Sequence, residues 1–293
     1  MVRSLRSLVK FVLTHPLNAN GRLNALGRVL RWQLVSRLAP GAVALPFVDN
    51  TFLWCQRGMT GATGNYYCGL HEFEEMAFVG HFLQPGDLFL DVGANVGSYS
   101  ILAAASGANV IAAEPLPATF RHLQMNVLLN RFQSTVTPMN IGLSDQAGEL
   151  RFTDALDTMN HVLAEGELAS SVSVRVDTID NLVGSAIPTV IKIDVEGYET
   201  AVLAGAASTL HDPALLAIIC ETNGSGHRFG VSDQDIHDVI LNCGFVACRN
   251  DPVHRIVSTG ASSNLNTLFI RDVVEANRRA AQSRQLRLVN GLL

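Results

Sequence analysis

The sequence predicts an α/β protein built on a doubly wound, mostly parallel β-sheet, with a helical extension at its N-terminus. Strand and helix signals alternate from Leu88 onward, which is typical of parallel sheets. At the start of this stretch, the apolar run 88–90 ends on Asp91 and opens into a glycine turn. A second apolar run, 110–113, ends on Glu114. These residues indicate one βαβ unit with an acidic residue at the tip of each strand.

The remaining elements follow from the same periodicity. A segment at 148–176 interrupts the alternation with two half-exposed strands and a polar connection, where we expect a substrate lid at the carboxyl side of the sheet. We expect strands at 88–92, 109–113, 135–139, 189–193, 215–221, 245–249 and near 266–270, and helices at 98–106, 118–130, 198–210 and 233–242.

Residues 1–70 form the N-terminal extension, 71–271 the main domain, and 272–293 a helical C-terminal tail. Apolar residues at helical spacing from Leu5 to Leu13 predict an amphipathic helix, and a second such pattern runs from Leu23 to Leu34. Two interpretations of residues 1–38 stay open: a helical cap on the domain at a homodimer interface, or a peripheral helix on an anionic membrane surface. Residues 51–70 are expected to be a loop or short hairpin carrying aromatic residues.

Charge and composition restrict the partners. The first 48 residues contain seven basic side chains and no acidic one. The rest of the chain therefore contains 14 basic and 26 acidic residues. An acidic catalytic body argues against a nucleic-acid substrate. No segment reaches the about 20 apolar residues of a membrane span. The five cysteines form no C-x-x-C pair, and their odd number, together with the lack of a recognisable secretion signal, favours reduced thiols in the cytoplasm.

The βαβ unit predicts a small-molecule site, because ligands bind at the carboxyl ends of parallel strands. A dinucleotide fingerprint fails at Asn95, where a glycine is required, and no phosphate-binding Lys-Ser/Thr loop is present. Asp91 suits the cationic amino-acid end of a ligand, and Glu114 can accept hydrogen bonds from ribose hydroxyls. S-adenosylmethionine has both features. The alternatives are a plain βα turn and a nicotinamide site.

Four sequence blocks between about Glu72 and Arg271 resemble the FkbM family of S-adenosylmethionine-dependent methyltransferases. They are FLDVGANVGSYS, AAEPLPATFRHLQMNVLLN, NIGLSDQAGELRF and, most specifically, TVIKIDVEGYETAVLAGA. The resemblance implies a Rossmann-like class I methyltransferase fold, S-adenosylmethionine as the cofactor, and methylation of hydroxyl groups on sugars, glycans or other hydroxylated metabolites.

The cofactor is expected to contact residues at successive strand ends. The first strand contributes the methionine-binding turn, the second the ribose contact and the third the border of the adenine; Asn140 can equally be a turn residue. The expected cofactor-binding residues are Asp91, Gly93, Ala94, Asn95, Gly97, Ser98, Glu114, Pro115, Asn140, Gly142, Asp145 and Asp194.

Catalytic candidates lie further along the chain. Lys192, Asp194 and Glu196 alternate, so an extended chain would point them the same way; a purely structural pair of Lys192 with Asp194 stays open. His161 and His227 are candidate bases. Glu199, in the first turn of the next helix, is interpreted as structural.

No metal-ligand spacing stands out, so no metal is expected. The alternative is Mg²⁺ held by the hard oxygens of Asp194, Glu196 and Glu221.

The leading function is therefore O-methylation of a small molecule or glycan, with no nucleic-acid partner, in the cytoplasm or at the inner face of a membrane. The alternatives are a nucleic-acid methyltransferase, a non-catalytic module docking at a membrane or glycan-assembly complex, and a nicotinamide oxidoreductase.

Overall fold

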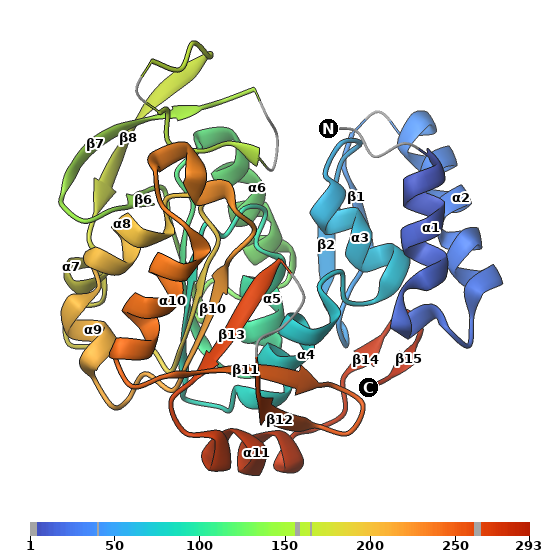
Figure 1. Cartoon of the computed structure of the whole chain (residues 1–293). Coiled ribbons are helices and arrows are strands. Elements are labelled where there is room, and N and C mark those ends of the chain that lie inside the picture. The colour runs from blue at the N-terminus through green and yellow to red at the C-terminus, as the bar shows by residue number, and fades with distance from the viewer. Residues whose placement is uncertain (1–4, 40, 156–158, 165, 261–264) are drawn as a thin grey trace.

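A computed structural model describes residues 5–39, 41–155, 159–164, 166–260 and 265–293 (Figure 1). Within these residues the largest sheet has eight strands in the order β12-β11-β13-β10-β9-β3-β4-β5. The run from β10 to β5 is parallel, whereas β13 pairs antiparallel with both β10 and β11. The strands are β3 (Leu88–Val92), β4 (Asn109–Ala113), β5 (Val136–Met139), β9 (Val190–Ile193), β10 (Ala217–Glu221), β11 (Val246–Asp251), β12 (Ile256–Thr259) and β13 (Asn266–Ile270).

Helices cover both faces of this sheet (Figure 1). Successive residues of one strand point to opposite faces, so Phe89 joins one hydrophobic cluster and Leu90 another. The first cluster includes α4 (Phe73–Phe82), α5 (Ser98–Ala105), α6 (Pro117–Leu129) and α11 (Val273–Gln282); the second includes α7 (Ile179–Val183), α8 (Glu199–Ala204), α9 (Ala207–His211) and α10 (Asp233–Asn242). The predicted doubly wound, mostly parallel fold is confirmed.

The single helix expected at 198–210 is wrong, because the chain forms α8 and α9 with a break at Gly205 and Ala206. A β-carbon on Gly205 would lie 2.1 Å from the backbone oxygen of Ser144. A close backbone approach from a distant segment therefore leaves room only for a glycine at the break.

The loop or hairpin expected at 51–70 is also wrong. The structure has strand β2 (Phe52–Cys55), which pairs antiparallel with β1 (Val43–Pro46), and helix α3 (Thr60–Cys68). Tyr66 and Tyr67 on α3 are buried. Burial of these aromatic rings offsets the weak helix propensity of the glycines in α3.

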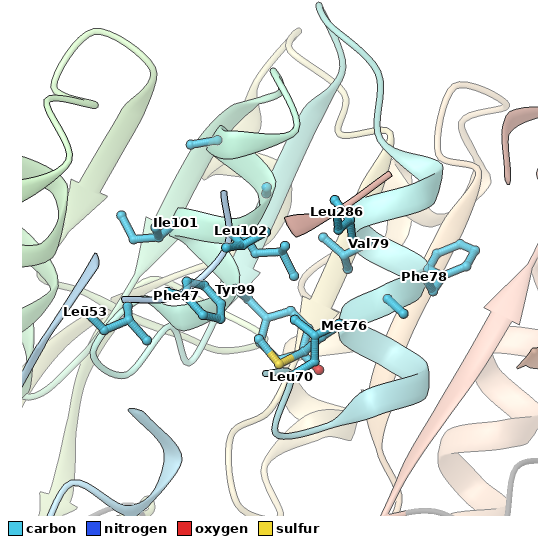
Figure 2. Packing of buried hydrophobic residues seen from close by; sticks show 14 of the residues in the cluster. Phe47, Leu53, Leu70, Met76, Phe78, Val79, Tyr99, Ile101, Leu102 and Leu286 are labelled. Atoms are coloured by element: carbon cyan, nitrogen blue, oxygen red, sulfur yellow. The ribbon is translucent and has the colours of Figure 1, made fainter. Parts of the chain in front are cut away.

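The N-terminal helices and the C-terminal tail pack into the first cluster. The N-terminal helices are α1 (Leu5–Thr14), η1 (Pro16–Asn18) and α2 (Arg22–Leu38). Figure 2 shows Phe47, Met76, Leu102 and Leu286 gathered in this core. The tail is helical only to Gln282, which corrects the sequence prediction; it continues as a strand pair, β14 (Arg287–Leu288) and β15 (Gly291–Leu292).

A small three-stranded sheet stands near the carboxyl ends of the main strands. It contains β6 (Gly142–Leu143), β7 (Gly148–Thr153) and β8 (Ser171–Asp177), so the two predicted half-exposed strands are confirmed. Its apolar face packs against Leu116, Tyr198 and Phe229, which follow β4, β9 and β10. This apolar face, which includes Val162 of the β7–β8 connection, therefore lies beside the edge where the predicted site residues gather.

Across the described ranges, no helix combines the length and the apolar character that crossing a bilayer requires.

Candidate active site

The glycine turn after β3 is shaped by close backbone contacts. The backbone N–H groups of Gly93 and Ala94 both donate to the Ala113 oxygen at 3.0 Å. Gly93 has a φ of 76°, and a β-carbon there would lie 1.9 Å from the backbone oxygen of Asp194. Gly97 is left-handed at the N-terminus of α5. Gly93 lets the turn pack directly on the segment that follows β9, and Gly97 makes room for Leu123 of the helix after β4.

Asp91 closes β3 as a buried carboxylate that is only half satisfied. Its side chain is 1% exposed, and Oδ2 accepts from Ser100 Oγ at 2.6 Å. Oδ1 is buried and has no hydrogen-bond partner. Burial raises the pKa of Asp91, although the neighbouring ammonium of Lys192 and the Ser100 hydroxyl oppose the shift. A buried acceptor without a donor is costly, so Oδ1 is suited to a donor supplied by a ligand.

Glu114 at the end of β4 is held by backbone donors. Its Oε2 accepts from the Asn95 N–H and its Oε1 from the Leu116 N–H, both at 2.9 Å. Burial raises the pKa of Glu114 to about 7, although these two hydrogen bonds oppose the shift. Asn140 donates from Nδ2 to the backbone oxygens of Glu114 and Pro115, at 2.9 and 2.8 Å. Asn140 thus braces the tip of β4.

Lys192 is the one lysine of the main domain, and it is buried among carboxylates. It lies opposite Asp91 in the β3–β9 pairing, and its Nζ donates to Asp194 Oδ2 at 2.7 Å. Burial lowers the pKa of Lys192, but the carboxylates of Asp194, Glu72 and Asp91 outweigh burial and raise it overall. Lys192 therefore remains protonated and orients Asp194.

Beyond β9 the chain does not stay extended. The strand ends at Ile193, and Glu196 has a positive φ of 55°, so the expected same-side alternation fails. Glu199 fixes the turn because its Oε1 accepts from the backbone N–H groups of Val195 and Gly197. The structural interpretation of Glu199 is supported by these two hydrogen bonds.

The turn brings three carboxylates together. One oxygen from each of Asp194, Glu196 and Glu221 lies within 4.8 Å of the other two. Burial, followed by the charges of Asp194 and Glu199, raises the pKa of Glu196 to about 7. Burial and the same carboxylate neighbours also raise the pKa of Glu221. Burial and acidic neighbours therefore oppose ionisation of Glu196 and Glu221, and Asp194 adjoins the glycine turn.

Other predicted residues lie around this centre. His161, in the β7–β8 connection, is buried, and its ring nitrogens pair with the Met159 oxygen at 2.8 Å and Glu167 Oε1 at 3.0 Å. His227 is exposed on η3 (Ser225–Phe229). Next to His227, Arg228 donates to the Glu196 backbone oxygen at 2.8 Å.

Three predicted cofactor contacts lie at the start of α5 or at β6. Ser98 is the first residue of α5 and is half-buried. Gly142 leaves room for the Phe152 ring, which would lie 2.9 Å from an added β-carbon. Asp145 is exposed, and its Oδ1 accepts from Ser144 Oγ at 2.9 Å.

Sequence reasoning missed three residues that touch the centre: Glu72, Tyr99 and Ser100. The Tyr99 hydroxyl donates to Glu72 Oε2, and the Lys192 ammonium lies 4.8 Å from the Tyr99 ring centroid. Ser100 and Tyr99 could have been found from helical spacing, since both lie in the first turn after the glycine loop. Glu72 carries no local signal.

Two curated proteins show what the chain resembles. It is 36% identical over 133 residues to the hexuronic acid methyltransferase AglP of Haloferax volcanii, a match covering 43% of this chain and 53% of AglP. It is 38% identical over 73 residues to the 31-O-demethyl-FK506 methyltransferase FkbM of Streptomyces tacrolimicus, covering 24% of this chain and 27% of that one. The chain thus spans about half the length of the first relative and less of the second.

Among solved structures, the FkbM methyltransferase of Methylobacillus flagellatus KT is 15% identical, with a TM-score of 0.46 over 85% of this chain and 60% of that one. The family model of the methyltransferase FkbM domain matches residues 91–247, more than half of the sequence, and runs from the carboxylate that ends β3 into β11. The chain belongs to the FkbM methyltransferase family.

Proposed function

We propose that this protein transfers a methyl group from S-adenosylmethionine to a hydroxyl group of a sugar, a glycan or another hydroxylated metabolite. The observation that carries the cofactor assignment is the pair of buried carboxylates, Asp91 and Glu114, at the ends of adjacent parallel strands on either side of a glycine turn.

The residues present fit this cofactor. The unpartnered Oδ1 of Asp91 can accept from the ammonium of the methionine moiety. Each oxygen of Glu114 takes one backbone N–H and keeps a lone pair for a ribose hydroxyl. The backbone of the 93–97 turn allows close approach. When bound, S-adenosylmethionine supplies an electrophilic methyl group on a sulfonium.

Lys192, Asp194 and Glu196 suit a nucleophilic displacement in which the acceptor hydroxyl also loses its proton. Lys192 holds Asp194, whose backbone contacts Gly93, so Asp194 adjoins the cofactor turn. Glu196 has a pKa of about 7, which suits a general base at neutral pH. In this role the Glu196 carboxylate takes the hydroxyl proton as the oxygen attacks the methyl carbon.

A sugar acceptor is supported by AglP, whose name gives hexuronic acid as its substrate. Asp194 and Glu196 would lie beside the acceptor hydroxyl, with the β7–β8 connection, including His161, nearby.

The test is transfer of labelled methyl from S-adenosylmethionine into a fractionated cell extract, followed by mass analysis of the labelled product. We expect label on a hydroxyl of a glycan or small metabolite. Label confined to RNA, DNA or protein would overturn the acceptor class. Absence of calorimetric binding of S-adenosylhomocysteine by the folded chain would overturn the cofactor assignment.

A further inference from the structure

The carboxylates of Asp194, Glu196 and Glu221 form the one group of this kind among the described residues whose ligand atoms are close enough to share an ion. They converge because β9 and β10 are adjacent and parallel, with Ile193 beside Cys220, so both strands end at the same edge. The group is held firmly, since Glu199 ties the 195–197 turn and a β-carbon on Gly197 would lie 2.6 Å from the Ser225 oxygen.

Glu221 supplies a second, independent observation. Its side chain is 8% exposed, and Oε1 accepts from Asn223 Nδ2 at 2.7 Å. Oε2 is buried and has no hydrogen-bond partner. A buried carboxylate oxygen without a donor is costly, and a bound cation removes that cost as well as the repulsion from its neighbours.

The spacing limit of the three oxygens falls inside the span of Ca²⁺ and exceeds that of Mg²⁺ by about 0.6 Å. Opposite oxygen ligands of Mg²⁺ are about 4.2 Å apart and those of Ca²⁺ about 4.6–5.2 Å apart, twice the usual metal–oxygen distances. The three carboxylate oxygens lie within 4.8 Å of one another. Small side-chain movements would suffice for all three to bind one ion.

We propose that Asp194, Glu196 and Glu221 bind a divalent cation of the Mg²⁺ or Mn²⁺ type. Its catalytic role rests on the proposed function: the cation would hold the acceptor hydroxyl oxygen and favour its deprotonated form. With the ion bound, the lowered pKa of the acceptor hydroxyl takes the place of a raised pKa at Glu196, so no protein base is required.

The resulting step is balanced. The hydroxyl O–H bond breaks, and its proton passes to water. The freed oxygen pair forms the new C–O bond, and the C–S bond of the sulfonium breaks with its electron pair left on sulfur. The products are a methyl ether, S-adenosylhomocysteine and one proton.

The test is titration of the full chain with Mn²⁺ in the absence of cofactor, with free Mn²⁺ measured by electron paramagnetic resonance. We expect one saturable site per chain. Glu221→Gln should weaken Mn²⁺ binding by at least about tenfold, since a ligating carboxylate becomes an amide. Glu196→Gln gives a second measurement, and Glu149→Gln, at an exposed carboxylate on β7, is the matched control.

S-adenosylhomocysteine binding is measured on the same samples. If it binds but wild-type protein shows no saturable Mn²⁺ site, or if all variants bind Mn²⁺ equally, the cation site is refuted while the proposed function stands. If Mn²⁺ binds as expected but S-adenosylhomocysteine does not, the proposed function fails and the cation site stands.

A different observation concerns helix α2, which has apolar residues on two opposite faces. Ala25, Val29 and Trp32 are buried against the protein. On the opposite side, four large leucines are exposed and fall within about 80° of one another at 100° per residue. These are Leu23 at 84%, Leu30 at 72%, Leu34 at 62% and Leu38 at 75% exposure.

Charge indicates what covers this leucine stripe. Arg22, Arg31 and Arg37 are exposed on the same helix, and residues 1–48 contain no acidic side chain. Apolar residues flanked by arginines on an exposed helix match an anionic bilayer surface, where leucines enter the acyl boundary and arginines meet lipid phosphates. We infer that α2 docks this protein on anionic membranes.

The test is flotation of the full chain with vesicles of phosphatidylcholine, with and without phosphatidylglycerol. We expect binding to the anionic vesicles, weakened by salt and lost in Leu30→Glu and Leu34→Glu. Leu168→Glu, at a fully exposed leucine of the β7–β8 connection, should bind like wild type. Lack of flotation would refute the inference. So would a dimer that Leu30→Glu dissociates, because a second copy would then cover the stripe.

Discussion

Protonation of Glu114 should control how tightly the cofactor binds. Each of its oxygens already accepts one backbone N–H, so a proton would occupy the lone pair that a ribose hydroxyl needs. With a pKa of about 7 in the free protein, Glu114 is mostly protonated at pH 6 and mostly ionised at pH 7.5. If only the ionised form binds well, the dissociation constant should be about eightfold larger at pH 6 than at pH 7.5.

The stability of the free protein should change in the opposite direction. A carboxyl whose pKa is raised on folding keeps its proton in the native state, while the unfolded chain has lost it. The free energy of unfolding therefore falls as pH rises from about 4.5 to about 7, by up to about 3 kcal/mol from this group. Bound cofactor should reduce that fall, because it favours the ionised form.

Calorimetry with S-adenosylhomocysteine at pH 6, 6.7 and 7.5 measures the effect below the range where the ligand's own amino group titrates. Glu114→Gln should flatten the pH dependence and weaken binding, since its amide accepts from only one of the two backbone donors and leaves the other unpaired, at about 1–3 kcal/mol. Glu149→Gln should keep the wild-type slope. Equal wild-type affinity at pH 6 and 7.5, or an unchanged slope in Glu114→Gln, would refute the reasoning.

Four further substitutions test other parts of the site and fold. Lys192→Met should lower the free energy of unfolding by about 3–5 kcal/mol in urea titrations, because it leaves buried carboxylates unpaired; a loss below about 1 kcal/mol would contradict this. Gly93→Ala should abolish S-adenosylhomocysteine binding in calorimetry, since its β-carbon would meet the Asp194 oxygen. Asp194→Asn should keep that affinity within a few-fold but nearly abolish methyl transfer; unchanged turnover would move the catalytic role elsewhere. Ser232→Ala removes the capping box with Asp235 and should cost about 1 kcal/mol of stability without affecting ligand binding.

The parts of the site that sequence could predict are those encoded within a few residues. Asp91 and Glu114 stand at strand tips because apolar periodicity ends at them, and the glycine turn follows directly. The fold class follows from the same alternation. Glu221 is likewise predicted at a strand end because an apolar run stops there. The pairing of β9 with β10 then brings it beside Asp194.

The parts that escaped prediction depend on contacts between distant segments. Glu72 reaches the site because α4 packs on α5, and nothing in its neighbourhood distinguishes it from Glu74 or Glu75. The glycine at the break after α8 is required by the Ser144 backbone, 61 residues upstream of Gly205. Helix α3 forms despite two glycines because the surrounding protein buries it, a tertiary effect that propensity cannot anticipate.

Charge balance links the cofactor carboxylates, Asp91 and Glu114, to the group of Asp194, Glu196 and Glu221. Lys192 provides one positive charge for Asp91, Asp194 and Glu72, and Glu196 and Glu221 add further acids a few ångströms away. Burial is the largest cause of the raised pKa values of Asp91, Glu114, Glu196 and Glu221, and neighbouring carboxylates add to it. A sulfonium cofactor at one end and a divalent cation at the other would supply the missing positive charge. Glu114 and Glu196 have pKa values of about 7, so protonation of these groups competes with ligand binding, and affinity should fall as the medium becomes acidic.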